Sequence, residues 1–352
     1  MKKLLCLALS LVLVLSFGAA ALADTYEIAM ITDIGTIDDK SFNQGTWEGI
    51  KAYCEANGKT FNYYQPSAQS TDMYIEKIDQ AVADGAKVIV TPGYLFEEPI
   101  FIAQTKYPDI YFLLIDGTPN LAYSEFFTGP KTVGVTYAEH ESAYLAGYAA
   151  VVDGMTNLGF MGGMAVPAVV NFGYGFVQGA EAAAKELGID GISINYHYTG
   201  GFDATPEAQA MAASWYQGGV ECIFACGGAV GNSVMAAAEA NNGKVIGVDV
   251  DQSSESETVI TSALKGLSST VEQILAEYYA DTFPGGQNLV FGAVNKGVAL
   301  PMATSKFEKF DQAQYDALFE KIAASEIVMQ TNADVASAAE LALEVTTVNL
   351  VQ

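Results

Sequence analysis

Short apolar runs alternate with longer stretches whose apolar positions recur at helical spacing. In the first half, the pattern predicts strands at residues 26–32, 60–64, 87–93, 110–116 and 132–137, with helices at 41–56 and 70–86 between them. In the second half it predicts strands at 157–163, 192–199, 221–228 and 244–251, and helices at 172–188, 204–219 and 231–243. Continuous apolar strands joined by helices are typical of parallel sheets covered on both faces. The sequence therefore predicts an α/β fold with two such sheets.

The last third of the pattern predicts that the chain returns to the first unit. Residues 258–266, 267–283 and 289–300 have the pattern of strand, helix and strand. We expect crossings between two lobes near 132–136, 259–262 and 292–298, which makes a three-strand hinge. The predicted division is 24–134 with 260–293 for lobe 1, and 135–259 with 294–352 for lobe 2. A chain of 352 residues exceeds what one hydrophobic core usually holds.

The N-terminal residues have the pattern of an export signal. Lys2 and Lys3 precede an apolar run from residue 4 to 17 and a small-residue stretch that ends before Asp24. This order predicts a signal peptide over 1–23 and a mature protein that is periplasmic or associated with the cell envelope. The early cysteine, Cys6, lies inside the apolar run, and Asp24 follows the predicted cleavage site, so we expect no lipid anchor.

Charge narrows the class of ligand. The formal net charge is −25, which would repel nucleic acid and anionic lipid. All 16 basic residues are lysine, so the chain lacks arginine, the usual bidentate partner of carboxylates and phosphates. We therefore expect a neutral small-molecule ligand and no nucleic-acid partner.

The cysteines and histidines indicate no metal or cofactor. Cys54, Cys222 and Cys226 follow the predicted signal peptide, an odd number without the spacing of a disulfide framework. We expect all three to be buried and reduced. His140 and His197 have no neighbouring cluster of ligands, so neither a metal site nor a cofactor is predicted.

The turn after the first strand collects polar and aromatic side chains. Asp33 ends the strand, and Ser41 with Gln44 three residues later forms a capping-box pattern for the next helix. We expect Ser41 to be the N-cap, with Phe42 and Asn43 facing a cleft in the first helical turn. The alternatives are that Phe42 is a hydrophobic staple and that the acidic residues 38 and 39 belong to a solvated loop.

Two aspartates mark equivalent places in the two halves. Asp116 and Asp249 each lie at the carboxyl end of a predicted fourth strand. Ligands of open α/β sheets bind at that end of the strands, so we expect both carboxylates to face one cleft.

Several long segments resemble one family. "TDIGTIDDKSFNQGTWEGI", "NFGYGFVQGAEAA", "GGAVGNSVMAAA", "IGVDVDQ" and "TSALKG" are similar to the basic membrane protein family of extracellular binding proteins. Characterised members of that family deliver purine nucleosides to ABC importers. The resemblance covers nearly all of residues 26–300. It implies the type I periplasmic-binding-protein fold, a nucleoside as ligand, and a membrane permease as partner of a monomeric protein.

The resemblance also implies roles for individual residues. Phe42 corresponds to an aromatic side chain that stacks on the nucleobase, with polar contacts nearby from Asp33, Ser41 and Asn43. Asp116, Asp249 and Lys265 match positions associated with gripping the ribose. For the second aromatic partner we favour Phe202 over Phe172, with Asn171 as a further polar contact.

Two other interpretations remain open at this point. A free monosaccharide would also suit carboxylates and an aromatic ring, so a sugar-binding protein of the same fold is the alternative ligand assignment. An enzyme, such as one that processes nucleosides, is less favoured. The glycines at 227, 228 and 231 do not match the G-x-G-x-x-G spacing, the "GNS" that follows lacks the lysine of a P-loop, and no G-x-S-x-G elbow is present.

Overall fold

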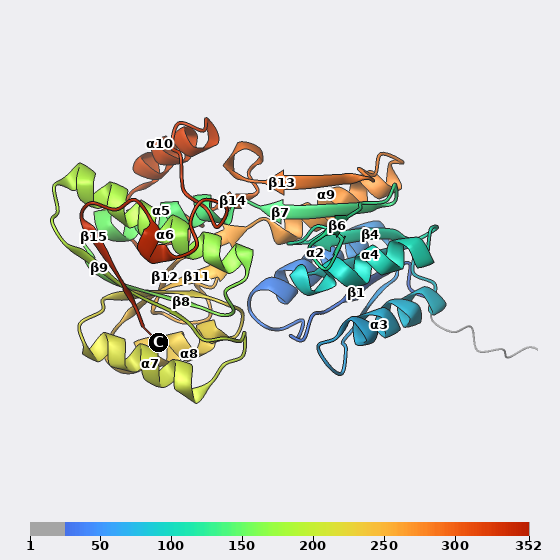
Figure 1. Ribbon diagram of the computed structural model, residues 1–352, viewed down its shortest axis with the longest axis horizontal. Helices are drawn as coiled ribbons and strands as arrows, with labels where there is room; N and C mark the ends of the chain where they lie inside the picture. The colour runs from blue at the N-terminus through green and yellow to red at the C-terminus, as the bar shows by residue number, and fades with distance from the viewer. Residues whose placement is uncertain (1–24, 352) are drawn as a thin grey trace, which may run out of the picture.

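The computed structural model describes residues 25–351 and divides them into two halves, each built on its own sheet (Figure 1). The first sheet has the strand order β13-β7-β4-β3-β1-β2, and its pairs are all parallel. Its strands are β1 (Ile28–Ile31), β2 (Phe61–Tyr64), β3 (Val88–Pro92), β4 (Tyr111–Ile115), β7 (Thr132–Tyr137) and β13 (Gln287–Phe291). Around it lie α2 (Phe42–Asn57), α3 (Thr71–Ala83), α4 (Glu97–Lys106) and α9 (Leu267–Tyr279).

The second sheet has seven strands in the order β14-β12-β11-β10-β8-β9-β15. They are β8 (Asn157–Gly162), β9 (Ile192–Tyr198), β10 (Cys222–Cys226), β11 (Lys244–Asp249), β12 (Val259–Lys265), β14 (Val298–Ala299) and β15 (Thr346–Leu350). Only the pair β12 and β14 is antiparallel within the part of this sheet that the structure describes. Its helices are α5 (Glu139–Val152), α6 (Pro167–Leu187), α7 (Pro206–Gln217), α8 (Val230–Asn241) and α10 (Gln312–Ala323).

Burial explains why the strands read as unbroken apolar runs. Every residue of β1, β3 and β10 is buried, because helices cover both faces of these central strands. Short elements complete the fold: β5 (Asn120–Leu121), β6 (Glu125–Phe126), η1 (Tyr94–Phe96), η2 (Ala293–Asn295) and η3 (Ala338–Glu340). The predicted α/β architecture of two doubly wound sheets is confirmed.

The chain passes between the halves at three places. It leaves β7 for α5 at Ala138, leaves β12 for α9 at Gly266, and runs from β13 to β14 through η2. β12 pairs with β11 in the second sheet, whereas the sequence-based division placed residues 260–265 with the first lobe. The crossing follows β12 instead of preceding it, because the strand's apolar residues complete the second sheet before the chain turns.

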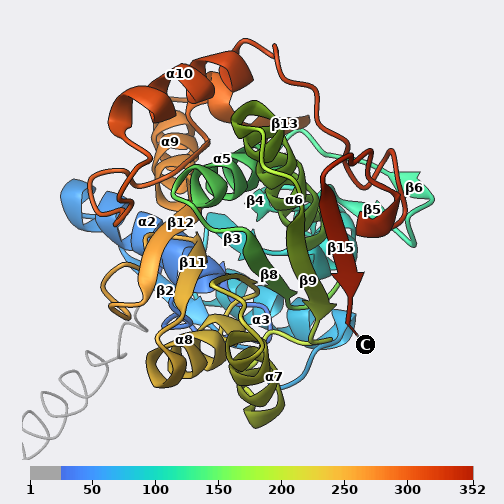
Figure 2. The ribbon, with the colours of Figure 1, turned by 90° about the vertical axis from the view of Figure 1, so that its left-hand side faces the viewer.

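The C-terminal segment is anchored to the second half, as Figure 2 shows for β15 at the sheet edge. The buried carboxylate of Glu181 on α6 accepts hydrogen bonds from the backbone N–H groups of Glu344, Val345 and Thr346. This contact sets the start of β15, which then pairs with β9.

The structure describes the three cysteines predicted to be buried, but not the N-terminal residues predicted to be a signal peptide. The predicted signal peptide, 1–23, lies outside the described residues. Among the helices of residues 25–351, none combines the length and apolar character needed to span a bilayer. Cys54, Cys222 and Cys226 are buried and free, as predicted.

Candidate functional site

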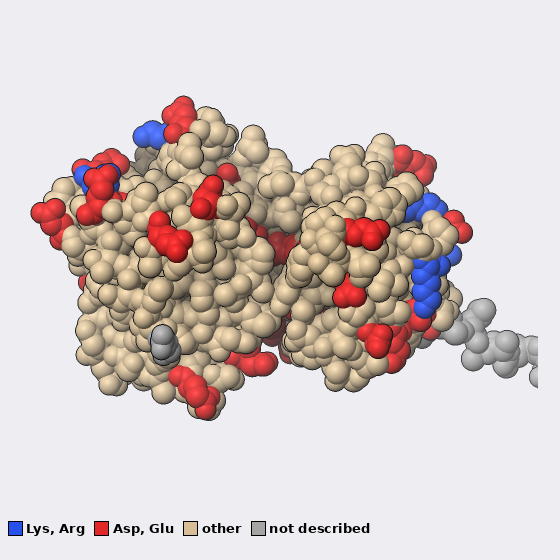
Figure 3. All heavy atoms as spheres, viewed as in Figure 1, with Lys and Arg blue, Asp and Glu red and all other residues tan. Residues whose placement is uncertain are grey.

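The carboxyl ends of strands from both sheets meet in the groove between the halves, where Figure 3 shows acidic atoms. Asp116 follows β4 of the first sheet, and Asp249 ends β11 of the second. Both residues have left-handed backbone conformations, with φ of 58° and 65°. Aspartate tolerates this region better than most residues, and such conformations concentrate at functional sites. The two halves thus present their carboxylates by the same local geometry.

Lys265, the last residue of β12, connects the two aspartates. Its ammonium group forms a contact with Asp116 and lies 3.5 Å from Glu139 and 4.0 Å from Asp249. The side chain is 3% exposed, so water screens these charges weakly. One cation is therefore surrounded by three carboxylates that come from different elements.

Burial and mutual repulsion alter the protonation of this cluster. Burial raises the pKa of Asp249 to about 6, although Lys265 and the hydroxyl of Ser41 favour its charged form. Burial likewise raises the pKa of Glu139 to about 7, with Lys265 opposing the change and Asp116 adding to it. Burial acts to lower the pKa of Lys265, but the three carboxylates outweigh it and raise that pKa above its usual value.

One acceptor in the cluster is unused. The Oδ1 atom of Asp116 is buried and has no hydrogen-bond partner among the described residues. Buried carboxylate oxygens are normally satisfied, because an unpaired buried acceptor is costly. The atom is thus available to accept a hydrogen bond from a ligand.

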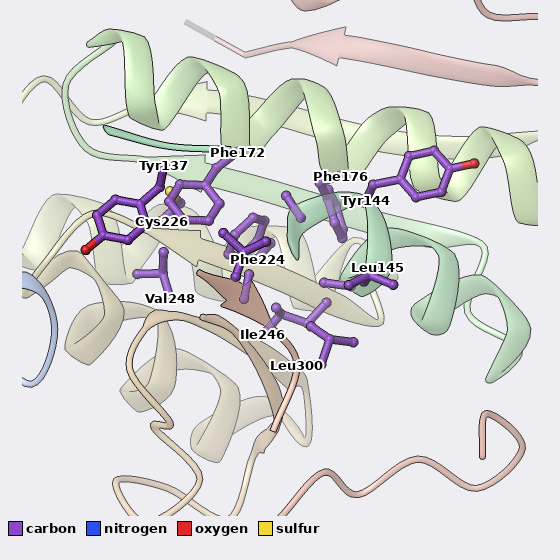
Figure 4. Packing of buried hydrophobic residues seen from close by; sticks show 14 of the residues in the cluster. Tyr137, Tyr144, Leu145, Phe172, Phe176, Phe224, Cys226, Ile246, Val248 and Leu300 are labelled. Atoms are coloured by element: carbon purple, nitrogen blue, oxygen red, sulfur yellow. The ribbon is translucent and has the colours of Figure 1, made fainter. Parts of the chain in front are cut away.

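Aromatic rings surround the ammonium group of Lys265. The Nζ atom lies 5.1 Å from the ring centroid of Phe42, 5.6 Å from that of Tyr137 and 5.2 Å from that of Phe172. Figure 4 shows Tyr137 and Phe172 side by side in a cluster of buried hydrophobic residues. Phe42 begins α2 in the first half, so the rings come from both halves. The site combines charge with flat apolar surface.

Ser41 holds a different role from the one its sequence pattern predicts. Its hydroxyl makes no cap hydrogen bond and donates to Asp249 across the groove, at 2.5 Å. The predicted capping box is wrong in this respect. Asp39 instead accepts hydrogen bonds from the N–H groups of Ser41, Asn43 and Gln44, at 2.9 to 3.0 Å. A carboxylate two residues earlier reaches these donors and frees the serine hydroxyl for the other half.

Asp33 and Asn43 bind each other beside this turn. The amide of Asn43 donates to Asp33 at 2.9 Å and to Asp39 at 3.0 Å, and the N–H of Gly35 donates to Asp33 at 2.6 Å. Burial raises the pKa of Asp33, and these hydrogen bonds oppose the increase. Their mutual bonds commit much of the hydrogen-bonding capacity of both side chains to shaping the loop.

The remaining predicted residues lie in the second half. Phe202 packs on the backbone beyond β8 and β10, so closely that a Cβ on Gly163 would be 2.4 Å from its ring. Asn171, on α6, accepts a hydrogen bond from the N–H of Asn332 at 2.9 Å. The ring of Phe172, the next residue, lies 5.2 Å from the Nζ atom of Lys265, measured to the ring centroid.

Further contacts join the halves on the same side as Ser41. The side-chain amide of Gln252 donates to the backbone oxygen of Lys40 at 2.7 Å, and the ammonium group of Lys40 lies 3.6 Å from Glu255. The loop after β1 therefore touches the loop after β11 at three points, counting the bond from Ser41 to Asp249.

Sequence reasoning missed Glu139 and Tyr137. Both flank the first crossing, because β7 ends at Tyr137 and α5 begins at Glu139. The available signal was a buried-strand pattern with an acidic residue two positions beyond its end, close to a predicted hinge. Among the described residues, no cluster of three or more histidine, cysteine or acidic side chains could hold a metal ion.

This arrangement, two sheets with a charged and aromatic site between them, is the architecture of two-lobed solute-binding proteins. Residues 26–333 match the family model described as ABC transporter substrate-binding protein PnrA-like, and the chain belongs to that family. The predicted resemblance to basic membrane proteins is confirmed.

Relatives and solved structures agree with this assignment. The ABC transporter nucleoside-binding protein BmpA of Lactococcus lactis subsp. cremoris is 29% identical over 305 residues, covering 80% of this chain and 83% of that protein. Basic membrane protein A2 of Borrelia garinii subsp. bavariensis is 32% identical, covering 85% and 86%. An ABC transporter solute-binding protein from Conexibacter woesei superposes with a TM-score of 0.70 at 27% identity, covering 87% and 99%.

Membership in the family fixes the general function. The protein is the substrate-binding component of an ABC transporter, acts outside the cytoplasm, binds a small molecule and works with a membrane permease.

Proposed function

We propose that the protein binds a neutral nucleoside, with a purine base, in the groove between its halves. The observation that supports this most directly is the unused buried oxygen of Asp116, held beside Lys265 and Asp249. Vicinal ribose hydroxyls are donors that such carboxylates accept, and hydrogen bonds to charged groups are stronger than neutral ones. The name of the Lactococcus relative, a nucleoside-binding protein, points to the same ligand class.

The aromatic residues suit the base. Phe42 comes from the first half and Phe202 from the second, so a flat base between them would contact both halves. Phe172 is almost fully buried, at 1% exposure, which favours Phe202 as the second stacking ring. Asn43, Asp33 and Asn171 offer polar atoms near the base edge, within the limits of the hydrogen bonds they already make.

The charge pattern argues for a ligand without phosphate. A 5′-phosphate in the groove would meet Asp116, Asp249 and Glu139, with Lys265 already paired to them. The protein should therefore bind nucleosides and reject nucleotides.

A free monosaccharide is the second candidate, because the same carboxylates would accept bonds from sugar hydroxyls. Isothermal titration with adenosine, guanosine, adenine, ribose and adenosine monophosphate separates the two ligand classes. We expect binding of the nucleosides, weaker binding of the free base, and none of the monophosphate. If ribose binds most tightly, the ligand is a sugar and the nucleoside assignment is wrong. Comparable affinity for adenosine and its monophosphate would contradict the expectation of a neutral ligand. Chromatography of the titrated adenosine should show it unchanged.

We propose a monomer, exported by the signal peptide over 1–23. The two lobes are proposed to move as units about the crossings at Ala138, Gly266 and η2. Sedimentation and mass spectrometry of the exported protein test the oligomeric state and the processed N-terminus.

A further inference from the structure

A second hollow lies in the first half, at the amino ends of its strands and so away from the groove. It has a volume of about 440 Å³. It is lined by residues before β1 and β7, at the start of β4, and around the end of α9: Glu27, Tyr111, Pro130, Tyr278, Tyr279, Asp281 and Phe283. This volume falls within the range of small-molecule sites.

The aromatic rings of this hollow hold each other in place. Tyr111 meets Tyr278 at 4.8 Å and Phe283 at 5.0 Å between ring centroids, both edge to face. Tyr278 meets Tyr279 at 4.8 Å in the same manner. Mutually perpendicular rings present several faces and edges to one partly open hollow. The rings form an aromatic wall of the hollow.

Two of these rings already bind ammonium groups of the chain itself. The Nζ atom of Lys59 lies 3.8 Å from the ring centroid of Tyr279, and that of Lys131 lies 5.3 Å from the centroid of Tyr111. Neither lysine lines the hollow. The rings are therefore electron-rich surfaces that attract cations, and none of the residues that line the hollow is basic.

The electrostatics of the lining favour a positive ligand. The lining contains two carboxylates, those of Glu27 and Asp281, and Asp281 is exposed. The hollow also adjoins the C-terminus of α9, whose last turn carries no basic residue. Helix C-termini have partial negative charge, which stabilises nearby cations.

We propose that this hollow binds a small organic ammonium ion, of the quaternary or alkylated ammonium class, independently of the ligand in the groove. Aromatic faces bind the alkylated nitrogen, and Glu27 with Asp281 balance its charge. A sugar would also fit aromatic rings and carboxylates, but it has no positive charge for the carboxylates, the helix terminus and the ring faces to attract.

The full-length mature protein can be titrated with choline and with 3,3-dimethyl-1-butanol, its uncharged isostere, by ligand-observed NMR. We expect choline to bind roughly 5- to 30-fold more tightly than the isostere, the range that cation–π attraction supplies. Equal binding of the two, or tighter binding of glucose than of choline, would overturn the proposal.

Variants locate the site. Asp281→Asn should weaken choline binding about two- to fivefold, because an exposed carboxylate contributes modestly. Phe283→Leu should weaken it further, while Asp190→Asn, an exposed control on the second half, should leave it unchanged. Asp249→Ala, in the groove, should also leave it unchanged. If Asp249→Ala removes choline binding and Asp281→Asn does not, the cation binds in the groove and the proposed second site is wrong. The nucleoside titrations test the ligand of the groove, so their result does not depend on whether choline binds in the hollow.

Discussion

At the residue scale, the central feature is an excess of buried carboxylates around one lysine. Asp116, Asp249 and Glu139 share Lys265, so the cluster carries more negative than positive charge when all its groups are ionised. The cost of burying that charge appears in the raised pKa values of Asp249 and Glu139. These two carboxylates therefore take up protons more readily in the folded protein than in the unfolded chain.

This excess predicts a pH dependence of stability. The pKa of Glu139, about 7, and that of Asp249, about 6, exceed their ordinary values, so the folded state holds more protons than the unfolded state at intermediate pH. Their contribution to the free energy of unfolding is complete below about pH 4 and is lost as the pH rises through 6 to 7. Glu139→Gln should remove its share, which is of order 1 kcal/mol.

Urea unfolding at pH 5.0 and 7.5 measures the effect. The difference between the two pH values should be smaller in Glu139→Gln than in the wild type, with Glu125→Gln, an exposed glutamate, as the control. An identical difference in Glu139→Gln and the wild type would show that Glu139 does not titrate in this range.

A second prediction at this scale concerns the ribose. If Asp116 and Asp249 accept bonds from its hydroxyls, a 2′-deoxynucleoside leaves one buried carboxylate without a partner. Bonds to charged groups contribute about 1.5 to 3 kcal/mol, which corresponds to a loss of roughly 10- to 150-fold in affinity. Asp116→Ala or Asp249→Ala should weaken ribonucleoside binding and narrow the gap between ribo and deoxy ligands. Calorimetry on both variants decides, since an unchanged ratio in each would remove these carboxylates from the ribose.

At the scale of elements, the start of α2 uses one residue to cap the helix and another to contact the second half. Asp39 satisfies three backbone N–H groups, and Ser41 is left to bind Asp249. Asp39→Ala should therefore lower the free energy of unfolding by about 1 to 2 kcal/mol, as loss of a helix cap does. Ser41→Ala should leave the helix end intact and act on ligand affinity instead. Thermal unfolding of both variants tests this, and equal destabilisation by the serine change would restore it as the cap.

The pairing of α5 with α6 depends on close backbone contact. A Cβ at Gly179 of α6 would be 2.0 Å from the backbone oxygen of Tyr144 on α5. Gly179→Ala should lower the free energy of unfolding by about 1 to 3 kcal/mol or more, because the helices must move apart. Gly201→Ala, where a Cβ meets nothing within 4 Å, is the matched control. Similar stability of the two variants, measured by urea unfolding, would contradict this account.

The same elements show what the sequence could and could not predict. Apolar runs predicted β1, β3 and β10 correctly, because a strand that is buried on both faces has apolar residues without interruption. The serine pattern before α2 predicted a side-chain cap that Ser41 does not make. Asp39 competes for the same backbone N–H donors, and local spacing does not show which of the two side chains accepts them. Glu139 escaped notice because its importance comes from Lys265, which lies 126 residues further along the chain.

At the scale of the whole molecule, three crossings join the halves, and the loop after β1 touches the loop after β11. These contacts bridge the groove on one side of the site. A ligand held by Phe42 and Asp116 from one half and by Asp249 from the other would add to them and favour closure.

Small-angle scattering should detect this closure. We expect the radius of gyration to fall when adenosine is added at saturation, and to change less in Asp249→Ala at the same concentration, because that variant lacks a contact from the second half. No change in the wild-type radius, with binding verified by calorimetry, would mean that the halves do not move on ligand binding.

Lys265 stands one residue before the second crossing, and Glu139 stands one residue after Ala138, where the first crossing occurs. A single substitution there would alter both ligand choice and the ease of lobe movement, two traits on which selection acts differently. A substitution on the lobe walls, for example at Phe202, would alter ligand choice without altering lobe movement. We therefore expect new ligand preferences to arise in this family through changes on the walls, and a sensor built from this scaffold to be retuned most safely there.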